Sequence, residues 1–244
     1  MKRVQPQGYG SRIIAFVLSP FLFPQSRVVL SHLPKLPEAS GLRYGKVPGP
    51  DPLRLLVFGD STAAGVGVEY QSEALAGALS RDLSQRFNRG VTWQLYARSG
   101  VTSAELRAFF LPSATSQEFD LIFLSIGVND VLNIRYTRQF AGDLTAILDA
   151  LRAASPEAWI IVPGVPRMER FDSLPDPLSS ILGARAHRIN HAARKVIDGR
   201  YRVVHAKPWP IGTPGFFAVD NFHPSAIGYA AWAKAALDYW QRRR

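Results

Sequence analysis

From Leu53 onwards, the chain alternates short apolar runs with longer segments whose apolar residues recur at helical spacing. The runs lack polar alternation, which is typical of strands buried on both faces of a parallel sheet. Helices that connect parallel strands cover both faces of such a sheet, so the pattern predicts a doubly wound α/β fold. The five predicted strands cover residues 53–58, 91–96, 120–125, 159–162 and 201–204.

Helical patterns separate these runs and also close the chain. A length of 244 residues with 47% hydrophobic residues fits one sizeable α/β domain, so we expect one active site. We assign residues 53–244 to this domain and residues 1–52 to an apolar, basic N-terminal segment with an extended lead-in. Sites in such sheets lie beyond the carboxyl ends of the strands. The predicted helices lie near residues 70–88, 102–111, 137–154, 178–198 and 225–241.

The turn after the first predicted strand contains a candidate nucleophile. Residues 59–65 read Gly-Asp-Ser-Thr-Ala-Ala-Gly, with Ser61 where a strand passes into a helix. A serine at this place is equally well explained as a helix cap. The G-x-S-x-G nucleophile motif does not apply, because position 63 is Ala.

Two further motifs follow the next two strands. Gly100 comes after the second strand and Asn129 after the third. A glycine lets the backbone come close to a ligand, and an Asn amide adds a hydrogen-bond donor. Together with the amide of Ser61, these groups are suited to surround a developing oxyanion. Either motif alone is more often an ordinary turn.

A histidine stands just before the last predicted helix, in Asp220-Asn221-Phe222-His223-Pro224. A carboxylate three residues ahead of a histidine reaches back to its ring nitrogen within one turn. It then fixes the tautomer of the ring and stabilises the imidazolium. Asp220 and His223 are therefore a candidate acid and base pair.

The four motifs together resemble those of the SGNH hydrolases, also called the GDSL esterases and lipases. The resemblance covers about residues 53–241 and implies a three-layer α/β/α sandwich with a five-stranded parallel sheet, as in flavodoxin-like folds. It implies that Asp220 is the family's acidic partner. The four family positions are matched by Ser61, Gly100, Asn129 and His223.

The resemblance implies a serine hydrolase for carboxylic esters or thioesters of short to medium acyl chain. Ser61 is the expected nucleophile and His223 its base. The oxyanion hole would consist of the amides of Ser61 and Gly100 and the side chain of Asn129. This mechanism needs no cofactor and no metal. Alternatives are a saccharide or lipid O-deacetylase, an acyltransferase, and a non-catalytic, membrane-associated binding domain.

The sequence departs from the family pattern at two places. Thr62 stands where the family name gives Leu, outside the chemistry, and no Asn precedes Gly100. Apolar residues near the motifs are weaker candidates, which either line an acyl pocket or simply pack. These substrate-binding candidates are Val66, Met168, Phe171 and Phe222.

The formal charge of +10 is concentrated at the ends of the chain. A nearly neutral body with basic ends does not resemble a nucleic-acid groove, so we expect no nucleic-acid partner and favour anionic lipid. The apolar residues 13–23 are either a membrane-surface or anchor element, or a helix packed on this domain or on a second subunit of a homodimer. We therefore expect a membrane-associated or a cytoplasmic location, with export as the alternative. The sequence contains no cysteine.

Overall fold

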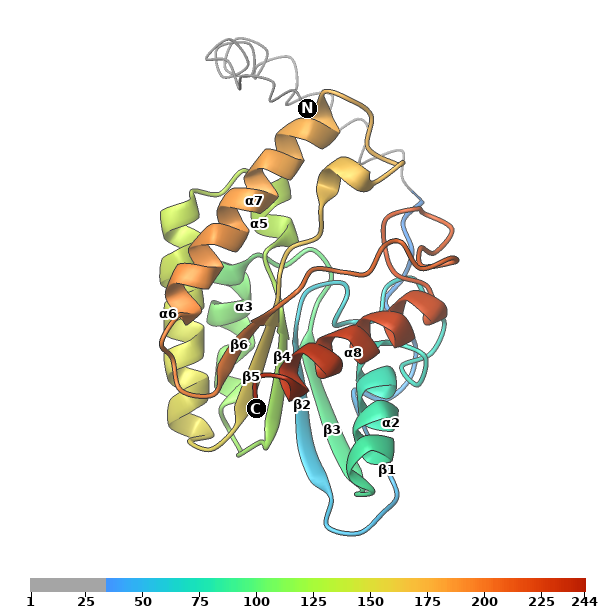
Figure 1. Cartoon of the computed structure of the whole chain (residues 1–244), viewed down its shortest axis with the longest axis vertical. Helices are drawn as coiled ribbons and strands as arrows, with labels where there is room; N and C mark the ends of the chain where they lie inside the picture. Colours follow the sequence, from blue (N-terminus) through green and yellow to red (C-terminus); the bar gives the residue numbers. More distant parts are fainter. Residues whose placement is uncertain (1–33) are drawn as a thin grey trace, which may run out of the picture.

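The computed structural model describes residues 34–244, which contain one sheet of six strands in the order β1-β3-β2-β4-β5-β6 (Figure 1). Five strands are parallel, as predicted, and β1 is antiparallel to β3. The strands are β1 (Tyr44–Val47), β2 (Leu53–Gly59), β3 (Val91–Ala97), β4 (Leu121–Ser125), β5 (Trp159–Pro163) and β6 (Val203–Ala206).

The edge strand β1 corrects the predicted count of five strands. It lies within the expected lead-in, on the N-terminal side of the boundary at residue 53, and belongs to the same sheet. Its register runs from Tyr44 opposite Gln94 to Val47 opposite Val91. Tyr44 and Lys46 are exposed, so β1 has no apolar run that would predict a strand. Strand β1 forms because it pairs with the longer strand β3.

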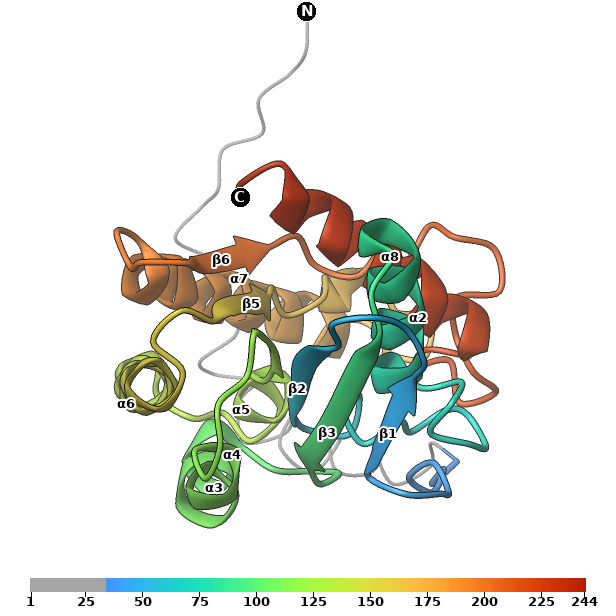
Figure 2. The same ribbon diagram turned by 90° about the horizontal axis from the view of Figure 1, so that it is seen from below.

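The helices form two layers around the sheet, which confirms the predicted three-layer α/β fold. Helices α2 and α8 contact each other on one face, while α6 contacts α3 and α7 on the other (Figures 1 and 2). Short helices α4 and α5 and the 3-10 helix η1 were not predicted. The bounds are α2 (Leu75–Phe87), α3 (Ser103–Phe109), α4 (Leu111–Ala114), α5 (Val128–Leu132), α6 (Thr137–Ala154), η1 (Met168–Arg170), α7 (Leu178–Ile197) and α8 (Ala226–Gln241).

The strand order places a topological switch point beside β2. The chain passes from β2 to β3 on one side and then to β4 on the other side. In register, Gly59 at the end of β2 lies beside Ala97 of β3 and Ser125 of β4. The loops that follow these three strands therefore start next to one another, where ligand sites occur in doubly wound sheets.

Aromatic packing fixes α8 against the sheet. The indole of Trp232 lies edge-on to Phe123 of β4, with ring centroids 5.5 Å apart, and both side chains are buried. Edge-to-face aromatic pairs add to the stabilisation that burial provides. Because α8 directly follows the loop with His223, this packing also positions that loop.

Candidate active site

Ser61 lies in the turn that follows β2. The N–H of Asp60 donates to the carbonyl of Ser125, 3.1 Å away at the end of β4, which ties the turn to the neighbouring strand. Thr62 donates from its N–H (3.1 Å) and its hydroxyl (2.9 Å) to one carboxylate oxygen of Asp60. The turn is thus fixed from both sides of Ser61, at the carboxyl edge of the sheet.

The carboxyl of Asp60 is buried next to the candidate nucleophile. Burial raises the pKa of Asp60 to about 6, against the lowering effect of the two Thr62 hydrogen bonds and the nearby His223. Its Oδ2 atom has no hydrogen-bond partner among residues 34–244. Asp60 therefore holds the turn at an electrostatic cost.

The loop at residues 220–224 brings His223 and Asp220 together. One carboxylate oxygen of Asp220 accepts from the backbone N–H groups of Phe222 and His223, each at 2.9 Å. The other lies 2.6 Å from Nδ1 of His223. Burial acts to raise the pKa of Asp220, but the hydrogen bonds from His223 and Phe222 outweigh it, and the pKa is lowered. An ionised Asp220 keeps the proton on Nδ1 and leaves Nε2 as an acceptor.

The second ring nitrogen of His223 faces Ser61. Nε2 lies 3.0 Å from the Ser61 hydroxyl oxygen, within the range for an O–H donor to an imidazole nitrogen. Ser61, His223 and Asp220 therefore form one hydrogen-bonded chain. This arrangement makes the serine hydroxyl a candidate nucleophile with an oriented base.

Gly100 lies in the tight turn after β3. The N–H of Val101 donates to the carbonyl of Arg98, 3.5 Å away, and Gly100 has a φ of +81°. This left-handed conformation favours glycine. Among residues 34–244, the N–H of Gly100 and the N–H of Ser61 have no hydrogen-bond acceptor. Both amides are free to bind an anionic oxygen.

Asn129 of α5 contacts the same turn. Its Nδ2 atom donates to the carbonyl of Val101 at 2.9 Å. An amide nitrogen carries two hydrogens, and the second has no acceptor within the described part of the chain. The bond to Val101 fixes the orientation of the amide beside Gly100.

The family model of the GDSL-like lipases and acylhydrolases matches residues 57–231, which is more than half of the chain. The chain belongs to this family. A GDSL-like esterase of Mycobacterium tuberculosis is 26% identical over 195 residues, which cover 74% of the chain and 59% of that relative. The chain thus spans under two thirds of the length of this relative. The family resemblance drawn from the sequence motifs is confirmed.

Solved structures of esterases share the fold of this GDSL-family chain. A lipase from a goat rumen metagenome aligns with a TM-score of 0.61 at 16% identity, over 77% of the chain and 97% of the lipase. An acetylxylan esterase from Geobacillus stearothermophilus aligns with a TM-score of 0.55 at 17% identity, over 79% and 95% of the two chains. At these identities, the similarity shows the fold alone.

A charged network lies next to the Asn129 motif of this GDSL-family chain. The buried carboxylate of Asp130 accepts from the N–H (3.0 Å) and hydroxyl (2.7 Å) of Ser103. The guanidinium of Arg135 bridges Asp130 (2.7 Å) and Asp143 (2.9 Å). No local pattern marks Arg135 or Asp143, because Asp130 lies in α5, Arg135 in the loop that follows it and Asp143 in α6. The network fastens the start of α3 to α5.

The four apolar substrate-binding candidates are all buried. Phe171 packs edge-on against Phe222, with centroids 5.4 Å apart, and is stacked on Trp209 at 5.9 Å. Met168 is wholly inaccessible, and Val66 is 1% exposed. These side chains pack the loops at the carboxyl ends of the strands, so in this conformation they offer little surface to an acyl chain.

The N-terminal segment at residues 13–23 lies outside the described residues. Within residues 34–244, no helix has both the length and the apolar character needed to cross a membrane. Membrane association and a homodimer therefore stay predictions from the sequence.

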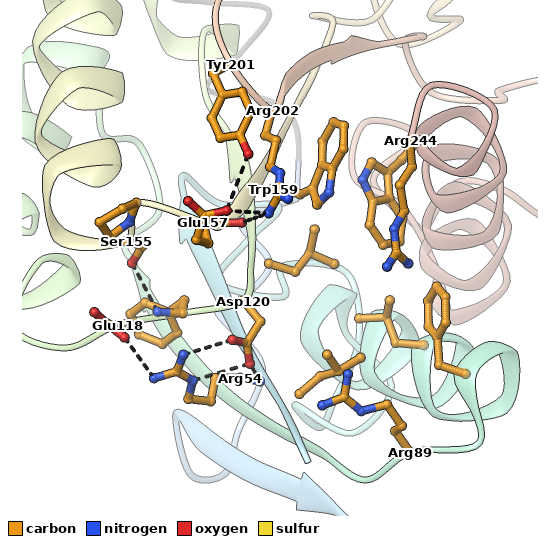
Figure 3. A pocket seen from close by; sticks show the side chains of 17 residues that line it. Arg54, Arg89, Glu118, Asp120, Ser155, Glu157, Trp159, Tyr201, Arg202 and Arg244 are labelled. Carbon is orange, nitrogen blue, oxygen red and sulfur yellow. Dashed lines mark hydrogen bonds and ion pairs between the residues drawn. The ribbon is translucent and has the colours of Figure 1, made fainter. Parts of the chain in front are cut away.

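A cleft of about 800 Å³ lies at the amino ends of the parallel strands, at the opposite end of the sheet from Ser61. Figure 3 shows the side chains that line this cleft. It includes Leu53, Leu121 and Trp159, which begin β2, β4 and β5. Within the cleft, Arg54 pairs with Asp120 at 2.8 Å, and Arg202 pairs with Glu157 at 3.1 Å (Figure 3). The cleft is therefore separate from the hydrogen-bonded Ser61, His223 and Asp220.

Proposed function

We propose that this chain is a serine hydrolase of carboxylic esters or thioesters that forms an acyl-serine intermediate. The observation that carries the proposal is the continuous chain from the Ser61 hydroxyl through both nitrogens of His223 to Asp220, at 3.0 and 2.6 Å. Membership of the GDSL-like lipase and acylhydrolase family supports the same reaction class. The intact set of groups argues against a non-catalytic binding domain.

Attack by Ser61 begins with proton transfer to Nε2 of His223. The oxygen then attacks the ester carbonyl, and its proton stays on the ring. The resulting imidazolium is stabilised by the carboxylate of Asp220 on Nδ1. The lowered pKa of Asp220 favours the ionised form of this carboxylate.

The carbonyl oxygen becomes negative as the tetrahedral intermediate forms. Three donors lack an acceptor among residues 34–244 and are available to it: the amides of Ser61 and Gly100 and one hydrogen of the Asn129 side chain. Fixed donors stabilise a developing charge without reorganisation during the reaction. Collapse of the intermediate expels the alcohol or thiol, which takes the proton from His223.

Water completes the cycle by attacking the acyl-enzyme. His223 accepts the proton of this water and returns it to Ser61 as the carboxylic acid leaves. Deacetylation is the same reaction with an acetyl ester as substrate. If an alcohol instead of water attacks the acyl-enzyme, the acyl group passes to that alcohol, so acyl transfer would use the same site.

A short to medium acyl chain fits the edge of the sheet around Ser61 best. Ser99 and Gly100 are exposed, so a substrate reaches the turn from solvent. The apolar side chains nearby, such as Phe171 and Phe222, are engaged in packing with each other. Without a preformed apolar groove from these residues, a long acyl chain gains little from burial.

Hydrolysis of p-nitrophenyl acetate by the wild type and by Ser61→Ala and His223→Ala tests this function. We expect each substitution to abolish turnover while the circular dichroism spectrum is unchanged. A series of p-nitrophenyl esters and acyl-CoA thioesters of increasing length then defines the acyl preference, with the highest kcat/KM expected at short to medium length. Full activity in either variant would refute the proposed roles.

A further inference from the structure

Residues 38–43 precede the part of the chain that the family model matches, yet they contact the loops that follow β2 and β3 at the carboxyl ends of the strands. The N–H of Ala39 donates to the carbonyl of Ala64, 3.3 Å away in the turn after Ser61. The Gln71 side chain is buried and donates to the carbonyls of both Ala39 (3.1 Å) and Ala64 (2.9 Å). Residues 38–43 are therefore fixed beside the turn that contains Ser61.

The same segment contacts the turn that contains Gly100. A carboxylate oxygen of Glu38 accepts from the N–H of Ser99 at 2.6 Å. The guanidinium of Arg43 donates to the carbonyl of Ala97 at 2.6 Å and is paired with the other carboxylate oxygen of Glu38. Glu38 and Arg43 thus hydrogen-bond to the backbone of Ser99 and Ala97, on the N-terminal side of Gly100.

We propose that Glu38, supported by Arg43, is a positioning residue for the oxyanion-binding amide of Gly100. Ser99 and Gly100 are adjacent, so their peptide planes share one Cα atom. Fixing the N–H of Ser99 narrows the directions in which the N–H of Gly100 points. Donors act on a developing charge only when they are already aimed at it.

The composition of the turn explains why such a support is needed. No Asn precedes Gly100, and among residues 34–244 the Ser99 side chain makes no hydrogen bond that would brace the turn. Ser99 and Gly100 are both exposed, and no heavy atom lies within 4 Å of the place where a Gly100 side chain would start. Packing does not hold Ser99 and Gly100 themselves. The hydrogen bond from Ser99 to Glu38 therefore adds to the Val101–Arg98 and Asn129–Val101 hydrogen bonds that restrain this turn.

The ion pair with Arg43 has an electrostatic function. A lone carboxylate next to the Gly100 turn would repel the oxyanion that this turn binds. The guanidinium of Arg43 offsets the charge of Glu38 while leaving its oxygen free to accept from Ser99. The side chain of Glu38 is 26% exposed and that of Arg43 is 42% exposed, so the ion pair contributes little to stability. Its effect is on the position of the Ser99 N–H and on the net charge next to Gly100.

The test uses Glu38→Ala, Glu38→Gln and Arg43→Ala in the full chain, with p-nitrophenyl acetate as substrate. Glu118→Ala is the matched control, because Glu118 pairs with Arg54 (3.6 Å) in the cleft at the opposite end of the sheet. We measure kcat, KM, the pH dependence of kcat/KM, and the melting temperature of each variant.

We expect Glu38→Ala to lower kcat roughly tenfold, a fraction of the loss seen when an oxyanion donor is deleted. KM and the midpoint of the pH profile should stay at the wild-type values, because Ser61 and His223 are unaffected. Glu38→Gln keeps an oxygen that accepts from Ser99 and should recover most of the kcat. Arg43→Ala should lower kcat in a way that added salt partly reverses.

The inference rests on the proposed function, and the two fail in different ways. If Ser61→Ala keeps its activity, the proposed function is wrong. If Ser61→Ala is inactive but Glu38→Ala retains the wild-type kcat, only the role of Glu38 is wrong. Equal losses in Glu38→Ala and Glu118→Ala, or the same loss in Glu38→Gln as in Glu38→Ala, would also overturn it.

Discussion

The Nε2 atom of His223 lies 3.0 Å from the hydroxyl oxygen of Ser61, although 162 positions separate the two residues. A hydrogen bond between the segment that follows Ser61 and the segment that follows His223 holds this contact in place. The phenol of Tyr229, in the first turn of α8, donates to the carbonyl of Val66 at 2.7 Å. Gly67 allows the two segments to approach each other closely, because a side chain at this position would collide with the carbonyl of Pro224.

Replacing Tyr229 tests this link. Tyr229→Phe removes the donor and leaves the buried carbonyl of Val66 unpaired, so the free energy of unfolding should fall by about 1–3 kcal/mol. Urea unfolding measures the change. Tyr70→Phe, at a position 52% exposed, should leave stability unchanged. Equal stability of the two variants would show that the Tyr229 hydrogen bond does not support the site.

The carboxylate of Asp220 is expected to matter for turnover more than for substrate binding. Asp220→Asn removes the charge that stabilises the imidazolium and allows the wrong tautomer of His223. We expect kcat for p-nitrophenyl acetate to fall roughly 10³- to 10⁴-fold with little change in KM. Asp149→Asn, which breaks an exposed pair with Arg200, is the control and should retain its activity. A loss of less than about tenfold in Asp220→Asn would argue against the role of this carboxylate.

Asp60 should make stability depend on pH in the opposite direction to a paired carboxylate. Its pKa is about 6 in the folded chain against 3.8 as the ordinary value. Between these values the folded state keeps a proton that the unfolded state has lost, so this group lowers stability as the pH rises from about 4 to about 6. Such a shift corresponds to about 3 kcal/mol at most.

Asp60→Asn removes this titration. The stability of the variant relative to the wild type should therefore increase between pH 4 and pH 7, by up to about 3 kcal/mol in chemical denaturation. Asp149→Asn, at an exposed pair with Arg200, is the control substitution in the same denaturation series. A difference between Asp60→Asn and the wild type that does not change with pH would contradict the raised pKa.

Arg135 is expected to be essential for stability. Arg135→Met leaves the buried carboxylates of Asp130 and Asp143 without their bridging cation and should cost about 3–5 kcal/mol. Arg200→Met, whose partner Asp149 is 59% exposed, should cost less than about 1 kcal/mol. Urea unfolding of both variants decides the matter. Similar costs for the two would mean that the network is not a structural support.

The sequence predicted the parts of this molecule that are encoded locally. Five apolar runs became β2 to β6, and the motif residues lie at the carboxyl edge of the sheet, where strand order brings their loops together. In contrast, β1 has exposed side chains, and Glu38 acts through a contact with Ser99, 61 positions away. Such features depend on pairing between distant segments, which no local pattern reveals.

The substrate-binding candidates show a related limit. Apolar residues beside catalytic motifs serve either a ligand or the core, and the sequence pattern is the same for both. Met168 and Phe171 are buried in the loop after β5, where Phe171 packs on Trp209. Only the three-dimensional packing distinguishes the two uses.

Labelling of the nucleophile tests the central claim most directly. The wild-type chain is treated with diethyl p-nitrophenyl phosphate, which phosphorylates activated serines, and intact mass and peptide mapping follow the product as esterase activity is lost. We predict one diethylphosphoryl group per chain, on Ser61, with inactivation in proportion to labelling and no labelling of Ser61→Ala. Full esterase activity in a chain labelled at Ser61, or inactivation by a label at another residue, would contradict the account.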